Sequence, residues 1–328
     1  MSLTAIASAP WAITNQAFAV VQGVLARHLR GEVADLEAVA ARLGRPLDNQ
    51  RADLPVHDGV AVVTLEGVLC KRSNLLTQVS GATSTQIAGD QFARAMADPT
   101  VSAIVLAIDS PGGTVDGTQQ LAEQVYAARG HKPVTALIDG IGASAAFWIA
   151  SAAQAVFITG DTAQVGSIGV ISSHVDQSGA EAQRGVKVSE VVAGRYKNVA
   201  SAHAPLTDDG RAVLQAQVDQ IYSTFLGDVA RNRGVSIDTA HKNMGDGRLF
   251  IGRDAIAAGL VDGVTSFSDV LKRHASPAGF QAAALPAARA LSPGDMGRLA
   301  GTRMAEAAAD GRTLTYSHAL ALVAEELR

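Results

Sequence analysis

Residues 134–153 read VTALIDGIGASAAFWIASAA, and this stretch decides the fold class. Its first five residues, 134–138, are apolar or β-branched and predict a buried strand. A turn with two glycines follows at 139–142, and the small residues from Ser144 to Ala153 predict a helix. A buried strand that leads directly into a helix is the repeating unit of an α/β protein.

The same unit recurs on both sides of this stretch. Residues 103–108 form a continuous apolar run, which predicts a strand buried on both faces, as in a parallel sheet. Alternating strands and helices therefore predict an α/β fold with a mainly parallel sheet and flanking helices. Further strands are expected at 60–65, 155–158, 168–171 and 188–193, and helices at 86–97, 116–128, 206–233 and 254–260. In the helix at 206–233, Thr207 is the expected N-cap.

Composition and spacing divide the chain into three parts. Residues 1–57 predict a helical N-terminal arm and linker, because apolar residues recur at helical spacing over 17–28 and 36–43. Residues 58–275 hold the strands and helices of the α/β domain. Residues 276–328 contain prolines among alanines and predict a linker followed by an Ala-rich helical tail.

The composition excludes several classes of protein. Of the 328 residues 48% are apolar and 18% are charged, which excludes wholesale disorder. The net charge of −4 gives no indication of a basic surface that would bind nucleic acid. The single cysteine, Cys70, cannot form an internal disulfide or a Cys-rich zinc site. The chain has no basic, apolar leader and no apolar run of about 18 residues. We therefore expect a soluble protein inside the cell, without cofactor or metal.

Ser144 is the first candidate for chemistry. The strand-to-helix turn presents its hydroxyl at the carboxyl end of a sheet and at the positive end of a helix, where backbone amides stabilise an oxyanion. The sequence GASAA at 142–146 half-matches a nucleophile elbow, since Ala146 stands where that motif has glycine. The alternative is that the small residues only let the helix pack closely on the strand.

The sequence DSPGG at 109–113 follows the buried strand 103–108. Paired glycines let a backbone turn its N–H groups toward a ligand. With the Gly112–Gly113 turn on one side and Ala145 on the other, the chain would supply both amides of an oxyanion hole. The alternative is an ordinary Ser-Pro-Gly turn.

A nucleophilic serine needs a base, and the sequence leaves two kinds open. His174 is the nearest downstream histidine in a strand context, whereas His203, His241 and His318 lie in polar segments typical of solvated side chains. Lys197 follows the predicted strand 188–193, and a lysine desolvated at an apolar site loses its proton near neutral pH. A lysine just after a strand more often faces solvent.

Four motifs occur in a fixed order: DSPGG at 109–113, ASAA at 143–146, GSIGV at 166–170 and GRYK at 194–197. A closing segment follows, with GRLFIGRDA at 247–255 and GLVD at 259–262. This order resembles the signal-peptide peptidase A family of serine–lysine peptidases over about residues 58–268. That family shares the crotonase-like fold of the Clp protease proteolytic subunit, so the resemblance implies the same fold here.

The resemblance also implies a role for each matching residue. Ser144 would be the nucleophile and Lys197 the general base, which takes the hydroxyl proton and returns it to the leaving amine. Gly113 and Ala145 would donate the oxyanion-hole amides. Ser167 would hydrogen-bond the lysine and hold it in place.

Members of the family assemble into rings in which the serine and the lysine can come from adjacent subunits, so the resemblance implies a homo-oligomer acting on polypeptides. The form with a helical arm and no anchor resembles the branch of tailed bacteriophages and prophages. Proteases of that branch trim portal and scaffold proteins during capsid assembly. The implied partners are portal, scaffold and capsid proteins, in the bacterial cytoplasm or within procapsids, with no nucleic acid or membrane.

Two other functions remain open. Crotonase-fold hydratases and isomerases bind acyl-CoA and also use paired backbone amides, although an obvious pair of glutamates near residues 112–145 is absent. The second alternative is a capsid-associated structural or scaffolding protein with a degenerate site, which is motivated by Ala145 and Ala146 after the serine.

Overall fold

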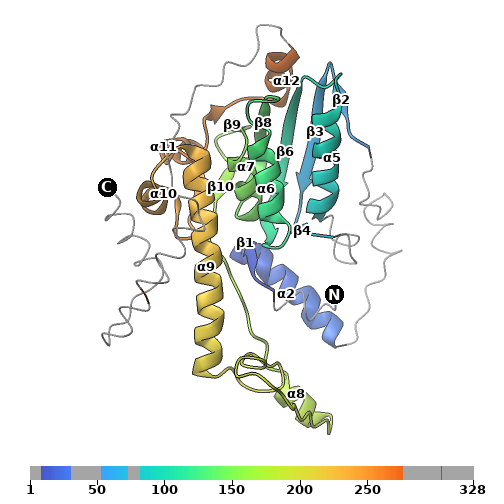
Figure 1. Cartoon of the computed structure of the whole chain (residues 1–328), viewed down its shortest axis with the longest axis vertical. Helices are drawn as coiled ribbons and strands as arrows, with labels where there is room; N and C mark the ends of the chain where they lie inside the picture. The colour runs from blue at the N-terminus through green and yellow to red at the C-terminus, as the bar shows by residue number, and fades with distance from the viewer. Residues whose placement is uncertain (1–8, 31–52, 73–81, 276–303, 305–328) are drawn as a thin grey trace.

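The computed structural model describes residues 9–30, 53–72, 82–275 and 304 (Figure 1). The predicted helical repeat at 36–43, His318 and nearly all of the tail at 276–328 lie outside the described residues. Within the described part, no helix is both long and apolar enough to cross a membrane.

The main sheet is mostly parallel and carries the core. Strands β3, β6 and β8 pair in parallel at its centre, and their buried side chains are shared between a large apolar cluster on one face and a smaller one on the other. The prediction of a mainly parallel α/β fold is therefore confirmed. The strands follow the order β11-β10-β8-β6-β3-β2, with β9 on β8 and β12 on β9: β2 (Val56–His57), β3 (Val60–Glu66), β6 (Ala103–Ser110), β8 (Val134–Ala143), β9 (Ala155–Ile158), β10 (Gln164–Gly166), β11 (Leu249–Ile251) and β12 (Gly263–Val264).

Strand β8 is twice as long as predicted, and two strands lie end to end along it. Its first half pairs with β9 and its second half pairs with β10, both in parallel. The predicted strand at 168–171 is wrong in position, because the pairing residues are those of β10. Ile171 forms only an isolated antiparallel bridge, with Trp11.

A second, four-stranded sheet lies beside the first. Its strands, in spatial order, are β1 (Trp11–Ile13), β7 (Gly112–Thr114), β4 (Leu69–Cys70) and β5 (Thr83–Ser84). Strand β1 corrects the prediction that the N-terminal arm is helical throughout, while α2 (Asn15–Leu29) confirms the helix predicted from the spacing at 17–28. Pro10 opposes helix at this point, and the apolar residues after it gain a partner in β7.

Helices α5, α6 and α7 pack against the main sheet (Figure 1), and each of them overlaps a helix that the sequence predicts. Ser84 and Thr207 cap α5 and α9 by accepting hydrogen bonds from backbone amides three residues on, as predicted for Thr207. Helices α8, α10 and α12 were not predicted. The helices are α5 (Thr85–Ala97), α6 (Thr118–Ala127), α7 (Ala145–Ser151), α8 (Ser178–Gln183), α9 (Asp208–Arg233), α10 (Ile237–Met244), α11 (Arg253–Ala257) and α12 (Phe267–Ala275).

Residues 172–206 extend away from the two sheets toward the N-terminal end of α9, and α8 lies within this segment (Figure 1). We call this segment the projecting arm. The strand predicted at 188–193 is wrong, since these residues form no regular structure and pair with no strand among the described residues. They are exposed instead, and 98% of the Val191 surface is accessible to solvent. An apolar run makes a strand only where a partner strand covers it.

Candidate active site

Ser144 stands between β8 and α7 in a strained backbone conformation. Its φ of 54° and ψ of −119° are rare for any residue other than glycine, and such strain persists where the surrounding structure imposes it. The backbone is held on both sides, because the Ser144 N–H donates to Gly166 O (2.7 Å) and the Ser144 carbonyl accepts from Trp148 N (2.9 Å). The sequence GASAA therefore does form a sharp strand-to-helix turn.

The Ser144 side chain is fully buried, and its Oγ has no hydrogen-bond partner in the described part of the chain. A buried hydroxyl without a partner loses free energy relative to water, so such groups call for an explanation. A nucleophile that awaits a base and a substrate is one explanation.

The prediction of a turn at Gly112–Gly113 is wrong, because these glycines begin strand β7, but they do lie beside Ser144 as expected. A methyl group added to Gly112, whose φ is +104°, would lie 2.9 Å from Ser144 Cβ. Ser110 holds the backbone at Gly112 in place, because its hydroxyl donates to Gly67 O (2.6 Å) and accepts from Gly112 N (3.2 Å). On the other side of Ser144, Ala145 begins α7 and is fully buried. The two glycines and the helix start therefore flank the serine.

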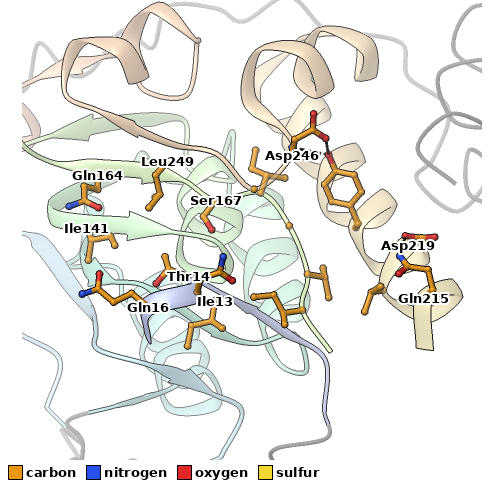
Figure 2. Close-up of a pocket in the computed structure, with 18 residues that line it drawn as sticks. Ile13, Thr14, Gln16, Ile141, Gln164, Ser167, Gln215, Asp219, Asp246 and Leu249 are labelled. Carbon is orange, nitrogen blue, oxygen red and sulfur yellow. Dashed lines mark hydrogen bonds between the residues drawn. The ribbon is translucent and has the colours of Figure 1, made fainter. Parts of the chain in front are cut away.

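Ser167 occupies the next turn of the backbone, directly after β10. It also has a positive φ, 52°, and its N–H donates to Arg248 O (2.6 Å). Ser167 lines a cleft of about 620 Å³, between Ile13 and Thr14 on one side and the residues Gln215 and Asp219 of α9 on the other (Figure 2). Ser144 itself does not line this cleft.

Two hydrogen-bonded polar pairs line the cleft, Gln215 with Asp219 (2.7 Å) and Tyr222 with Asp246. Tyr222 donates to Asp246 Oδ1 (3.4 Å) and accepts from Asp246 N (3.1 Å). Burial raises the pKa of the Tyr222 phenol to about 12, and the Asp246 carboxylate acts in the same direction. The phenol therefore stays protonated at neutral pH and is a donor rather than a base.

The structure does not bring Lys197 to Ser144. Lys197 lies in the projecting arm with an exposed side chain, and the Ser144 hydroxyl has no hydrogen-bond partner. The three candidate histidines that the structure describes have other partners: His174 contacts Ser201 O (2.8 Å) within the projecting arm, His203 pairs with Glu181 (2.7 Å), and His241 pairs with Asp246 (3.2 Å). Among the described residues of one chain, no lysine or histidine side chain therefore hydrogen-bonds the Ser144 hydroxyl.

Comparison with known proteins assigns the family. The family model described as "Peptidase family S49" matches residues 127–281, which include Ser144, Ser167 and Lys197. The matched region, residues 127–281, belongs to peptidase family S49. Among curated relatives, "Capsid assembly protease C" of Escherichia phage lambda is 32% identical over 68% of this chain and 50% of its own length.

Two further relatives of this chain have different names. "Head-tail preconnector protein GP5" of Enterobacteria phage P21 is 34% identical over 66% of this chain and 42% of that protein. "Protease 4" of Haemophilus influenzae is 26% identical over 66% of this chain and 34% of that protein. The chain thus spans about half the length, or less, of these relatives.

The candidate site also contains a strand that the sequence did not predict, β1. Residues Trp11–Ile13 pair with β7, whose first two residues are the glycines Gly112 and Gly113 beside Ser144. The available signal was Pro10 followed by apolar residues, which is compatible with a short strand, but the helical spacing after residue 17 dominated the interpretation of the arm.

Proposed function

We propose that this chain is a serine endopeptidase of the Clp/crotonase-like fold, in which Ser144 attacks the peptide carbonyl and Lys197 is the base. The observation that carries the proposal is Ser144 itself. Its backbone is held at a strained turn, its hydroxyl is buried without a partner, and a pair of glycines and a helix start flank it.

The chemistry is acyl transfer. Ser144 Oγ adds to the carbonyl carbon while Lys197 takes its proton, and the oxygen of the tetrahedral intermediate is held by the N–H groups of Gly113 and Ala145. Lys197 returns the proton to the leaving amine, and water then hydrolyses the ester on Ser144. Ser167 is the proposed hydrogen-bond partner that positions the Lys197 ammonium. Its place at the cleft gives an incoming side chain access to its hydroxyl.

Lys197 is proposed to act on the Ser144 of an adjacent copy, in a closed homo-oligomer. The projecting arm supports this, because it exposes apolar side chains that a monomer leaves uncovered: Val191 at 98%, Tyr196 at 61% and Val186 at 50%. Docking these residues on a neighbour would bury them and desolvate Lys197 at the same time. An arm that is polar throughout would not support this proposal.

The proposed substrates are proteins of phage capsid assembly. This rests on the names of the two phage relatives, since one is a capsid assembly protease and the other a head-tail preconnector protein. We propose portal or scaffold proteins as substrates, and the host cytoplasm or the procapsid as the place of action. The division into an arm at 1–57, a peptidase domain at 58–275 and a tail at 276–328 is part of this proposal.

The test compares four full-length chains: wild type, Ser144→Ala, Lys197→Ala and Lys187→Ala. Lys187 is the matched control, because it is another exposed lysine of the projecting arm. Each chain is incubated with an unfolded protein, and intact-protein mass spectrometry follows the products. We expect cleavage by the wild type and the control only, with a loss of at least about 1000-fold in the other two.

Mixing the two inactive variants tests whether the site is shared. A mixed oligomer pairs an intact Ser144 from one chain with an intact Lys197 from another, so partial activity should return. No return of activity would place both residues in one chain. No cleavage by the wild type under any condition would favour the alternative, a structural protein of the same fold.

A further inference from the structure

The strand β1 has the geometry of a peptide bound beside Ser144. It pairs antiparallel with β7 in the register Trp11↔Thr114, Ala12↔Gly113 and Ile13↔Gly112. On its other edge, Trp11 exchanges two hydrogen bonds of 2.8 Å with Ile171. The segment therefore lies between two backbones as an added strand, which is how extended peptides are recognised by sheet edges.

The register brings one carbonyl group to the pair of glycines. Val115 N donates to Pro10 O (3.3 Å), and Thr14 N donates to Pro111 O (3.0 Å). Hydrogen-bonded pairs alternate in an antiparallel ladder, so Ala12 and Gly113, midway between these two pairs, also face each other as a hydrogen-bonded pair. The Ala12 carbonyl is thus directed toward the Gly113 amide, one of the two proposed oxyanion donors.

Ser144 lies at the same place. A methyl group added to Gly112 would lie 2.3 Å from the Ala12 carbonyl oxygen and 2.9 Å from Ser144 Cβ. The carbonyl of Ala12 and the side chain of Ser144 therefore border one small space that only glycine leaves free. The Ala12 side chain, a single methyl group, is fully buried there.

The flanks of the segment hold it in place. Trp11 and Ile13 are buried in a small apolar cluster with Phe18, Val21 and Cys70. Beyond Ala12, Ile13 and Thr14 line the 620 Å³ cleft that also holds Ser167 (Figure 2). The Ala12–Ile13 bond thus joins a residue that lies beside Ser144 to a residue that lines the cleft.

We propose that Pro10–Thr14 is a built-in substrate segment, which fills the acyl side of the peptide groove and presents the Ala12–Ile13 bond to Ser144 for self-cleavage. The inference rests on the proposed peptidase function. It assigns the groove to extended peptides with a small apolar residue on the acyl side of the cleaved bond. Until that bond is cut, the chain excludes other peptides from its own site.

The reaction uses only groups already named, and water. Ser144 Oγ bonds to the Ala12 carbonyl carbon, the bond to the Ile13 nitrogen breaks, and that nitrogen receives the serine proton through the base. Water then hydrolyses the ester, which leaves a carboxylate at Ala12 and restores the hydroxyl. The products are residues 1–12 and a chain that begins at Ile13, with the acyl side of the groove vacated.

The experiment follows the N-terminus of the full chain and the hydrolysis of an added unfolded protein in one sample. For the wild type we expect a new N-terminus at Ile13, and a lag in the hydrolysis of the added protein that ends as this cut is completed. Ser144→Ala should keep its original N-terminus. Ala12→Gly should still be cut, whereas Ala12→Phe should lose the cut, because no space exists for the ring.

The outcomes separate the two proposals. Hydrolysis of the added protein by a wild-type chain whose N-terminus stays intact, without a lag, overturns the built-in substrate and leaves the peptidase proposal standing. Neither hydrolysis nor self-cleavage overturns both.

A mixing experiment tests whether each chain cuts its own segment. Isotopically heavy Ser144→Ala chains are incubated with light wild-type chains, and mass spectrometry reads both. We expect only the light chain to lose residues 1–12, because the segment lies at the serine of its own chain. Equal cutting of the heavy chain would overturn the placement of the segment.

Discussion

The indole of Trp148 donates a hydrogen bond of 2.9 Å to the carboxylate of Asp228, and both side chains are buried. Trp148 belongs to α7, the helix that begins after Ser144, and Asp228 belongs to the long helix α9. The same indole stacks on Phe225 with 4.4 Å between ring centroids and 5° between planes. The helix that follows the nucleophile is therefore anchored by α9, the helix that also carries one wall of the cleft.

The first prediction concerns the pH dependence of this anchor. Burial raises the pKa of the Asp228 carboxyl, while Arg231 and the Trp148 hydrogen bond oppose that effect. A carboxyl with a higher pKa in the folded chain binds its proton more tightly when folded, so its ionisation lowers the free energy of unfolding as pH rises. The difference in this free energy, wild type minus Asp228→Asn, should therefore fall as pH rises from about 4.

Urea denaturation of both chains across this pH range measures the difference. Asn keeps an acceptor for the indole, so the variant isolates the charge. A difference that rises with pH would contradict the raised pKa.

The second prediction concerns the backbone strain at Ser144. Ser144→Gly and Ser144→Ala both remove the hydroxyl and both should be inactive. Only glycine tolerates a φ of 54° with a ψ of −119° without strain, so Ser144→Gly should exceed Ser144→Ala in unfolding free energy by about 1 kcal/mol. Chemical denaturation of the two variants checks this, and equal stabilities would mean that the turn relaxes.

The third prediction concerns the pair of glycines that begins β7. A methyl group on Gly113 would lie 1.9 Å from Leu69 O, a backbone atom that cannot move alone. Gly113→Ala should therefore lower the free energy of unfolding by about 2 kcal/mol or more and abolish activity. Gly160→Ala is the control, since a methyl group there meets no atom within 4 Å, and it should change stability little. A stable, active Gly113→Ala chain would refute the proposed oxyanion role of Gly113.

The fourth prediction concerns Arg129, which closes the other end of α7. Its guanidinium donates to the carbonyls of Ser151, Ala152, Ala153 and Asn232 at 2.7–3.1 Å, and burial lowers its pKa to about 10. A lysine ammonium cannot make the same set of hydrogen bonds as the planar guanidinium, so Arg129→Lys should lower the free energy of unfolding by about 3 kcal/mol. Arg253→Lys, at an exposed ion pair with Asp161, should cost less than about 0.5 kcal/mol. Thermal denaturation compares them, and equal small losses would contradict the capping role.

The core of the fold was predictable because its signals are local. The strand at 155–158 was predicted with its observed bounds, and Thr207 was predicted as the cap of α9. Both depend on residues within one element and its neighbours. The strand expected at 188–193 failed because its formation needed a partner that the described chain does not supply. Strand β1 was missed for the reverse reason, since its partners are about 100 and 160 residues away.

By itself, the sequence determined the parallel α/β core, the turn at Ser144 and the candidate oxyanion residues, because buried runs, glycines and caps act over a few residues. Only the tertiary structure decided what faces that turn. In the folded chain Lys197 lies on the exposed projecting arm, and Ala12 lies beside Ser144 because β1 pairs with the distant strand β7. Such pairings depend on which edges and faces the folded body leaves open, and no short stretch of sequence records that.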